Sequence, residues 1–507
     1  MNNKRILLIY PKLGFSGNFT RHLPLSLLYA SSELVKNGFD VEILDIRLYV
    51  DSWEKELRKR INNDILVVGI SVMSGKPILN AMEIGRLVKE INPEIKIVWG
   101  GPHATFYPES ILTNDWYCDF VISGYGSKAF YELILCLNDN IIPDQVKGVS
   151  YKKDGKIVTI PYDAVFEFID YKDIPYHLIT DYSVYGQLEY NQIMFSMYSV
   201  MGCPYACAFC SSPAYYKEFK KKWVTVPLTQ IVDHIEFLVT NYKAEYIYFI
   251  DDDSFVNLSH VEGIIDEINR RGLKVRLGFR GARINEIMKM SDEFINKLAL
   301  AGTDILHVGA ESGSDNMLRL FNKNFKVADI IESNIKLARH PEIKTAYNFI
   351  LGIPSETIDD LNATRRLIMR LVKDNPNCII FAPNTYRPLP NTELFKLASK
   401  WGYKYPTTMR EWINVEVEGE FNPSWIGKKE KKLSKLLIIG SYFIDKKVRR
   451  IITGKTLFYK LLILLDTLYG PIIRFRYKHG IYQWLFEYYF YQYFVDKMAK
   501  TGKIPKD

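Results

Sequence analysis

The chain has 507 residues, of which 48% are hydrophobic and 24% charged, and its formal net charge is +8. This composition excludes a disordered or low-complexity protein, and six cysteines are too few for a disulfide-stabilised secreted scaffold. The length favours about three domains or fewer. A charge of +8 is mild for this size and favours a mixed solvated surface over a nucleic-acid-binding face. The unusual counts are 34 tyrosines and 28 phenylalanines.

The N-terminal apolar run at residues 6–10 is too short for a signal peptide. No window offers about 20 uninterrupted apolar residues, which a membrane span requires. The nearest, Leu457 to Ile473, is interrupted by Lys460 and Asp466. We therefore expect a cytoplasmic protein whose cysteines are ligands or core thiols rather than disulfides.

Residues 4–125 alternate between short apolar runs and amphipathic stretches. The runs predict strands at 4–10, 41–46, 65–72, 95–99 and 120–123. The stretches predict helices at 25–36, 53–61 and 77–91. This alternation is typical of a doubly wound parallel sheet, here in a first domain of residues 1–140. Such a sheet binds its ligand at the carboxyl ends of its strands.

Residues 141–190 differ from their surroundings: Asp154-Gly155 predicts a hairpin turn, and the rest is loop-like, so we expect a linker. From residue 191 to 400 the alternation resumes. Strands are predicted at 192–200, 245–251, 274–280, 304–310, 344–351 and 378–386. Helices are predicted at 227–241, 259–271, 291–301, 327–339, 357–373 and 391–401. Six such units predict a partial (β/α)6 barrel with its site at the carboxyl ends of the strands. Residues 401–507 are expected to be helical, with a dense aromatic stretch at 481–494.

Three of the six cysteines form the motif Cys203-x3-Cys207-x2-Cys210, just after the first barrel strand. Four thiolates usually hold a cubane iron–sulfur cluster, so three leave one iron open to bind and activate a ligand. A zinc site or unrelated core thiols are the alternatives, but zinc needs a fourth ligand, and the next histidine is His234. The remaining cysteines lack such spacing and are expected in the core: Cys118, Cys136 and Cys378.

This motif, with Phe209 before its last cysteine, resembles the signature of the radical S-adenosylmethionine (SAM) superfamily. Three further segments resemble that family's second-, fourth- and fifth-strand motifs in order: 248–255, 309–313 and 350–357. The resemblance covers roughly residues 190–400. It implies a [4Fe–4S] cluster on the three cysteines, with SAM chelating the open iron.

The resemblance also implies contacts to SAM. Glu311 is expected to accept hydrogen bonds from the amino or ribose groups, and Arg280 to hold a carboxylate or phosphate. The alternatives are a structural ion pair for Glu311, a pair with the aspartates at 251–253 for Arg280, and a solvated loop for Asp252. The expected cofactor-binding set is Phe209, Asp252, Arg280, Glu311, Ser312, Ile353 and Pro354.

The first domain resembles the cobalamin-binding domain that precedes many radical enzymes. The matching loops imply contacts from Gly14, Met73, Ser74, Gly100, Gly101, His103 and Gly124. A G-x-G-x-x-G fingerprint is missing after the first strand, which disfavours a dinucleotide. A domain that has lost its ligand is the other alternative. The D-x-H-x-x-G motif that supplies an axial histidine is also missing, so we expect a cobalt without a protein histidine, facing Met73, Ser74 or water.

Residues 386–392, followed by Trp401-Gly402 and Glu411-Trp412, resemble a subgroup of cobalamin-dependent C-methyltransferases and the anaerobic magnesium-protoporphyrin monomethyl ester cyclase. The resemblance implies that a 5′-deoxyadenosyl radical takes hydrogen from an unactivated carbon and that methylcobalamin supplies a methyl group. The alternatives are radical oxidation or cyclisation without methyl transfer, and a cobalamin sensor with a vestigial barrel.

The expected partners are a small-molecule substrate, with an apolar one as an option, and a one-electron reductant such as flavodoxin or ferredoxin. No nucleic acid is expected. Tyr386 and Arg387, on the last barrel strand, are catalytic candidates for the substrate wall, and core packing is the alternative for Tyr386. The aromatic tail is expected either to pack on the barrel or to contact a membrane surface peripherally.

Overall fold

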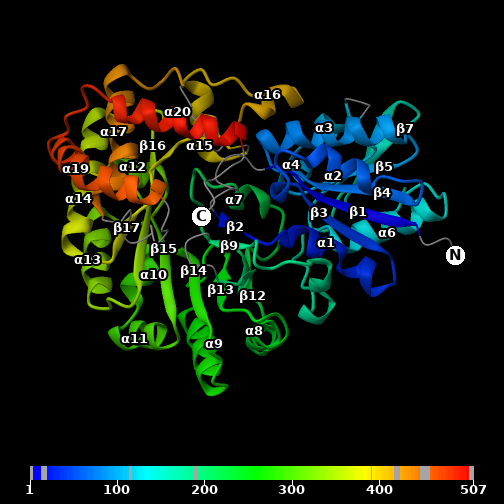
Figure 1. Cartoon of the computed structure of the whole chain (residues 1–507), viewed down its shortest axis with the longest axis horizontal. Helices are drawn as coiled ribbons and strands as arrows, with labels where there is room; N and C mark the ends of the chain where they lie inside the picture. Colours follow the sequence, from blue (N-terminus) through cyan, green and yellow to red (C-terminus); the bar gives the residue numbers. More distant parts are fainter. Residues whose placement is uncertain are drawn as a thin grey trace.

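The computed structural model describes residues 4–12, 20–113, 117–187, 192–389, 391–415, 423–445 and 457–501. Of the predicted site residues, Gly14 lies outside this set. Two α/β domains stand side by side, and most of the helices that follow cover the second one (Figure 1). The predicted fold class, a doubly wound sheet followed by a partial barrel and a helical region, is confirmed.

The first sheet has seven strands in the order β3-β1-β4-β5-β6-β7-β8. Its parallel strands are β3 (Val41–Asp45), β1 (Arg5–Tyr10), β4 (Ile65–Ser71), β5 (Lys96–Gly100) and β6 (Phe120–Ile122). This is the strand order of flavodoxin-like doubly wound sheets, in which the ligand binds where the order reverses. In this chain that point lies at the carboxyl ends of β1 and β4.

Side chains alternate between the two faces of this sheet, and each face has its own helices. Ile6 and Leu8 share a buried cluster with residues of α1 (Leu25–Lys36) and α6 (Ser127–Asn138). Leu7 and Ile9 share another with α2 (Trp53–Arg60) and α3 (Lys76–Ile91). Burial on both faces explains why these strands are nearly continuous apolar runs.

The hairpin predicted around Asp154-Gly155 belongs to this sheet. It consists of β7 (Val149–Lys153) and β8 (Lys156–Thr159), and β7 pairs antiparallel with β6. The predicted linker of 141–190 therefore contains two strands of the first domain. Its later part packs on the barrel, where Ile174 and Tyr176 are buried in the main hydrophobic core.

The second sheet has six parallel strands in chain order and forms an open half-barrel. They are β10 (Met194–Met197), β13 (Tyr246–Phe249), β14 (Arg276–Ala282), β15 (Thr303–Glu311), β16 (Lys344–Leu351) and β17 (Cys378–Ile380). The strand predicted at 378–386 is split, because β18 (Asn384–Thr385) pairs separately with the end of β16. The main barrel helices are α8 (Leu228–Tyr242), α9 (Leu258–Arg270), α11 (Asp292–Leu300), α13 (Val327–Ala338), α14 (Ile358–Asp374) and α15 (Glu393–Lys400).

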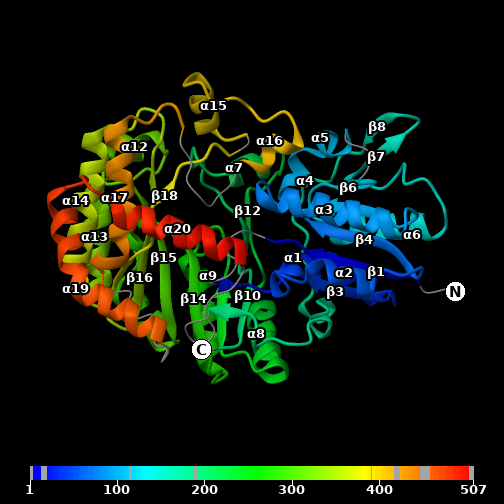
Figure 2. The same ribbon diagram turned by 45° about the horizontal axis from the view of Figure 1, so that its top comes forward.

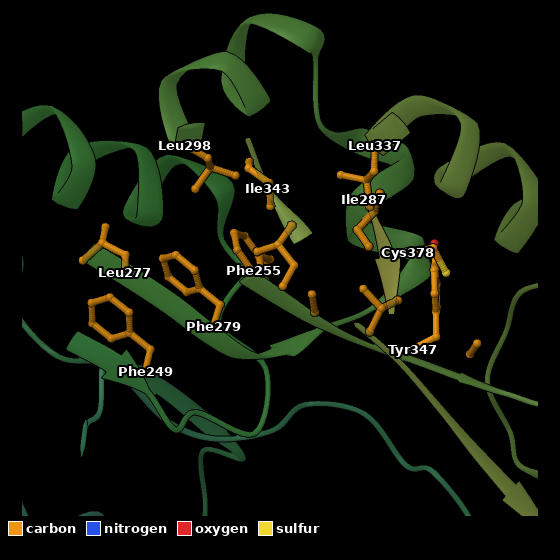
Figure 3. Close-up of a cluster of buried hydrophobic side chains, with 14 of the residues drawn as sticks. Phe249, Phe255, Leu277, Phe279, Ile287, Leu298, Leu337, Ile343, Tyr347 and Cys378 are labelled. Carbon is orange, nitrogen blue, oxygen red and sulfur yellow. The ribbon is translucent and has the colours of Figure 1, made fainter. Parts of the chain in front are cut away.

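The core of the barrel lies between the strands and their covering helices. Figure 3 shows Phe249 and Phe279 on neighbouring strands pointing to the helical side, where Leu298 meets them. The two phenyl rings stack with centroids 4.9 Å apart. Because side chains alternate along a strand, Tyr248 and Arg280 point to the opposite, inner face.

The C-terminal region divides between the two domains. The short helix α16 (Met409–Ile413) lies against the first domain, beside α3 (Figure 2). Two longer helices, α17 (Lys428–Ile444) and α19 (Leu457–His479), lie against α14 and each other at the barrel, and α20 (Phe486–Thr501) lies against α17. Of the aromatic tail at 481–494, Tyr488 is buried in the main core, whereas Trp484 and Phe490 are exposed, so the tail packs on the barrel with one face only. Among the described helices, none is long and apolar enough to cross a membrane.

Candidate functional site

The cysteine motif occupies a loop after β11 (Val200–Gly202), a short strand paired with β12 (Trp223–Thr225). Gly202 has a φ of +80°, and a Cβ there would lie 2.3 Å from the carbonyl oxygen of Lys222, so only glycine fits. The loop backbone is held by Phe321 and Leu394: the Ala208 N–H donates to the Phe321 carbonyl at 3.0 Å, and the Leu394 N–H donates to the Ala208 carbonyl at 2.9 Å. The loop is thus anchored between the segments after β15 and β18.

The three thiols are the donor set that the resemblance assigns to a cluster. Cys207 is buried and the other two are half-buried. Burial raises the pKa of the Cys203 thiol to about 12 and also raises the pKa of Cys210, so a bound metal is needed to stabilise the thiolates. No three His, Cys, Asp or Glu side chains in the described part of the chain close around one metal ion. A cubane spreads its thiolates over different irons, so this donor set fits it better than it fits zinc.

Arg283, which the sequence analysis missed, is the cation at this loop. Its Nη1 donates to Sγ of Cys207 at 3.0 Å, and its Nη2 donates to the Lys323 carbonyl at 3.0 Å. The guanidinium lies 3.8 Å from the ring centre of Tyr205. This buried positive charge offsets the negative charge that a thiolate-bound cluster would bring. The available signal was its position directly after the third barrel strand, three residues beyond Arg280.

Glu311 reaches the cysteine loop, but its carboxylate already has a cation partner. Its Oε1 lies 2.9 Å from Nζ of Lys323, and both side chains are buried. Lys323 in turn lies 5.3 Å from the ring centre of Phe209. The structure therefore contains the ion pair weighed as the alternative for Glu311, with lysine in place of arginine. The role of Glu311 toward SAM stays a prediction.

The three consecutive aspartates have three different environments. Asp251 is buried and accepts hydrogen bonds from Ser199 and Ser254, so it holds the strand end together. Asp253 is buried near Glu286 and Arg283, and burial raises its pKa well above the usual value. Asp252 alone is exposed, and it accepts a 2.8 Å hydrogen bond from Ser212 just after the cysteines. The structure thus leaves Asp252 open to a ligand, as its predicted role requires.

Other predicted contacts lie in the packing beneath the loop. Ile353 and Tyr386 are 1% and 3% exposed and share a buried cluster with Ala208, so the alternative of core packing holds for Tyr386. Pro354 is also buried. Ser312 is buried and its Oγ lies 3.2 Å from Oγ1 of Thr364, which stabilises the turn after β15. Arg387 is half-buried, and its charge lowers the pKa of Tyr403 against the larger raising effect of burial.

Glu356, in the fifth-strand motif, is half-buried; its Oε2 accepts a hydrogen bond from the Gly352 N–H, and its Oε1 is shielded from solvent. Burial raises its pKa to about 8 from 4.5. The folded state thus favours the neutral carboxyl group. The free energy of unfolding is therefore highest below about pH 4.5 and falls as pH rises, until the fall is complete above about pH 8. Relative to Glu356→Gln, wild type should lose on the order of 5 kcal/mol of unfolding free energy over this range. Anaerobic denaturant unfolding at several pH values measures this, with the exposed Glu342→Gln as the control. Parallel pH profiles for wild type and Glu356→Gln would contradict it.

The carboxyl edge of the first sheet is open at two of its loops. Met73, after β4, is 43% exposed. A Cβ at Gly100 would meet no atom within 4 Å, whereas at Gly101, with a φ of +97°, it would lie 2.9 Å from the Val72 carbonyl oxygen. The Gly124 N–H donates to Oγ1 of Thr105 at 3.0 Å, which ties the last two loops together. This glycine-lined edge fits a large flat ligand that approaches the backbone closely.

His103, in the short helix α4 (Pro102–Phe106), is held away from that edge. It is fully buried, its Nδ1 lies 3.0 Å from Oγ of Ser74, and its ring packs against Tyr107 and Trp412. Burial lowers its pKa to about 3, so the imidazole is neutral. This geometry fits a loop residue that hydrogen-bonds to Ser74 rather than a side chain open to cobalamin, so the contact implied for His103 stays a prediction. The open thioether of Met73 and the glycine edge are the residues that fit a cobalamin.

When cobalamin is reconstituted into the protein, its spectrum is therefore expected to be that of a cobalt with no nitrogen ligand from the protein. Replacing His103 by glutamine should leave that spectrum unchanged, because the ring is buried behind Ser74. Electron paramagnetic resonance of the Co(II) state is the measurement. Strong coupling to a nitrogen that disappears in His103→Gln would contradict the assignment.

Two family comparisons agree with the two sites. The family described as "B12 binding domain" matches residues 20–134, and the "Radical SAM superfamily" matches residues 197–368. The chain is a cobalamin-binding radical SAM enzyme. In this cobalamin-binding radical SAM enzyme the cysteine motif lies within residues 197–368, and the glycine-lined edge lies within residues 20–134.

The relatives of this cobalamin-binding radical SAM enzyme include methyltransferases and cyclases. It is 27% identical over 378 residues to an uncharacterized methyltransferase of Pyrococcus horikoshii, covering 74% of this chain and 78% of that protein. It is 26% identical over 409 residues to the anaerobic magnesium-protoporphyrin IX monomethyl ester cyclase of Rubrivivax gelatinosus, covering 77% of this chain and 69% of that protein.

Two solved structures share its fold. The cobalamin-dependent SAM radical enzyme OxsB with aqua-cobalamin bound aligns with a TM-score of 0.70 at 18% identity, over 94% of this chain and 72% of that one. The radical SAM methyltransferase TsrM of Kitasatospora setae, with cobalamin and a [4Fe–4S] cluster bound, aligns with a TM-score of 0.63 at 19% identity, over 78% and 75%. These alignments support the fold and the order of its two domains.

Proposed function

We propose that the protein is a C-methyltransferase that moves a methyl group from SAM, by way of cobalamin, to an unactivated carbon of a small molecule. The observation that carries this is the contact between the cobalamin edge and the cysteine loop. Phe106 of α4 meets Tyr215 edge-on with ring centroids 5.8 Å apart, and Tyr125, after β6, meets Phe219 at 6.3 Å. Tyr215 and Phe219 lie shortly after the last cysteine in the chain. The cobalamin edge and the cysteine loop are therefore neighbours, as a substrate carbon that reacts with both cofactors requires.

When bound, the cofactors supply the bond chemistry: the reduced cluster cleaves SAM to a carbon radical, and cobalamin carries the methyl group. The chain positions and shields them. The cysteines hold the cluster, and Arg283 offsets its charge beside Cys207. Asp252 is the exposed acceptor for an amino or hydroxyl group of SAM. Met73 is the accessible side chain at the cobalamin edge, and the burial of His103 keeps imidazole off the cobalt.

The test is the mass of the product formed with methyl-labelled SAM and a candidate substrate under anaerobic, reducing conditions. Gain of one labelled methyl group, together with 5′-deoxyadenosine, supports the proposal. The cyclase among the relatives makes oxidation or ring closure the competing outcome. Loss of hydrogen or gain of oxygen without label supports that outcome. Absence of 5′-deoxyadenosine supports a cobalamin sensor instead.

The proposal also requires a one-electron donor, for which we propose the flavodoxin or ferredoxin class, because reductive cleavage of SAM consumes one electron that the cluster must receive. A reduced flavodoxin that supports SAM cleavage without dithionite would satisfy this requirement. Failure of every flavodoxin and ferredoxin tested, with dithionite active, would contradict it.

We further propose that α19 and α20 rest on an anionic lipid surface. Both helices expose large apolar side chains: Leu464, Leu468, Ile472, Phe475, Phe486, Tyr489, Phe490 and Tyr493. The exposed Lys460 and Lys478 supply positive charge on α19. The protein should float with vesicles that contain phosphatidylserine and not with neutral vesicles. Replacing Leu468 and Phe475 by serine should abolish flotation, and unchanged flotation would contradict the contact.

A further inference from the structure

The inner face of the half-barrel carries a row of four rings that begins in the first domain. His22, just before α1, stacks on Tyr248 of β13 with centroids 5.4 Å apart. Tyr248 meets His307 of β15 edge-on at 5.7 Å, and His307 stacks on Phe381 at 5.1 Å. Nδ1 of His22 lies 2.9 Å from Oγ of Ser196, which anchors the first ring to β10. The row therefore crosses the barrel from its first strand to its last.

Arg280 points to the same inner face. Its neighbour Phe279 packs on the opposite, helical side (Figure 3). Burial, and then the charge of Arg280, lower the pKa of both His22 and His307 to about 4. The charge of Arg280 thus acts on both rings. Arg280 is exposed and the two imidazoles are half-buried, so this part of the inner face is accessible to a ligand.

The charge of Arg280 has no counter-charge in the part of the chain that the structure describes: no carboxylate oxygen lies within 4.0 Å of it. Both imidazoles are neutral, and Nε2 of His307 is buried without a hydrogen-bond partner there. Of the aspartates at the barrel mouth, Asp251 accepts a hydrogen bond from Ser199 and Asp252 from Ser212, and neither forms an ion pair with Arg280. The exposed guanidinium beside these rings is therefore available to form paired hydrogen bonds with an anionic group of a ligand.

We propose that Arg280 binds an oxyanion of the substrate, a carboxylate or a phosphate, and that the four rings form a flat wall for the apolar part of the same molecule. This inference rests on the proposed function, because it names the class of molecule that receives the methyl group. Guanidinium groups bind both oxyanions through paired hydrogen bonds, and aromatic faces pack on flat apolar groups. Arg280 thereby acquires a role different from the SAM contact expected from the sequence. The arginine that touches the cysteine loop is Arg283.

The test uses three probes titrated calorimetrically into the anaerobic full-length enzyme loaded with cluster and cobalamin: phenylacetate, phenyl phosphate and the neutral phenylacetamide. Wild type should prefer one of the anions over the amide by about tenfold or more. The preferred anion identifies the oxyanion as carboxylate or phosphate. Arg280→Gln should lose this preference. Arg58→Gln removes the same charge from an exposed position on α2 and should keep it.

Titration of SAM into the same proteins separates substrate from cofactor. Arg280→Gln should bind SAM within about threefold of wild type. The variant should melt no lower than wild type, because Arg280 has no described ion pair to lose. Three results would overturn the proposal: loss of SAM affinity as large as the loss for the anions, no preference for an anion in wild type, or a melting temperature lower by more than about 5 °C. None of these measurements involves turnover, so their failure is distinct from a failure of methyl transfer.

Discussion

Replacement of Cys207 by alanine is expected to abolish the reductive cleavage of SAM. Cys207 is the buried member of the motif, and its Sγ accepts the hydrogen bond from Arg283. Without it only two thiolates remain, and the guanidinium loses its anionic partner. Loss of an outer-shell partner alone costs roughly 10- to 100-fold in metal affinity or activity, so loss of a ligand should exceed that range. Alanine at Cys203 or Cys210 should have the same result. Iron and sulfide content, the cluster's electron paramagnetic resonance signal and 5′-deoxyadenosine formation measure it.

The matched control is Cys136→Ala. Cys136 is a half-buried free cysteine on α6 of the first domain. Its replacement by alanine removes the same chemical group at a position away from the cysteine loop. It should keep the iron content and the activity of wild type. Cluster loading that survives alanine at Cys207 would remove this thiol from the ligand set, and equal losses in both variants would indicate general damage from thiol removal.

Replacement of Trp412 by alanine is expected to cost roughly 3–5 kcal/mol of unfolding free energy. The side chain is 1% exposed and lies in the core of the first domain, although it is about 300 residues away in sequence from its ring partners there. Its ring packs at 4.5 Å on Tyr107 and at 5.4 Å on His103. The variant should also bind cobalamin more weakly, because the loop that carries His103 and Gly101 loses its support. Denaturant unfolding and cobalamin titration measure the two effects.

Trp401→Ala is the control, since Trp401 lies in the same post-barrel segment and is 46% exposed. It removes an equal side chain and should cost less than about 1 kcal/mol. If both variants are equally stable, α16 contributes nothing to the first domain. If Trp412→Ala lowers stability but leaves cobalamin affinity intact, the loop is held by other contacts.

Local pattern was sufficient for most of the secondary structure. The strand predicted at 344–351 matches β16, and the helix predicted at 25–36 matches α1, residue for residue. These strands are buried on both faces, so their apolar runs are uninterrupted and easily separated from amphipathic helices. The strand predicted at 378–386 was too long, because its second half pairs only with the end of β16.

The candidate site was predicted where its residues are close in sequence. The three cysteines and Asp252 carry their chemistry in short motifs, and the structure places Asp252 beside the cysteine loop through Ser212. The ion pair of Glu311 with Lys323 and the contact of Arg283 with Cys207 join segments 12 to 76 residues apart. No periodicity connects such positions, so their pairing followed only from the folded chain.

The sequence by itself determined two sheets and their order along the chain, and it predicted the three cysteines as ligands of a cluster, because burial patterns and ligand spacing are local properties. Only the tertiary structure decided how the 34 tyrosines and 28 phenylalanines are used. In the folded chain Trp412 and Tyr405 contact the first domain, whereas Tyr477 and Tyr488 are buried in the barrel core. The outer faces of α19 and α20 stay exposed. The tertiary structure also brought His22 of the first domain to Tyr248 of the second. Burial of an aromatic side chain stabilises the fold wherever it occurs, so composition alone does not predict its partner. The topology of the chain determines which residues it contacts.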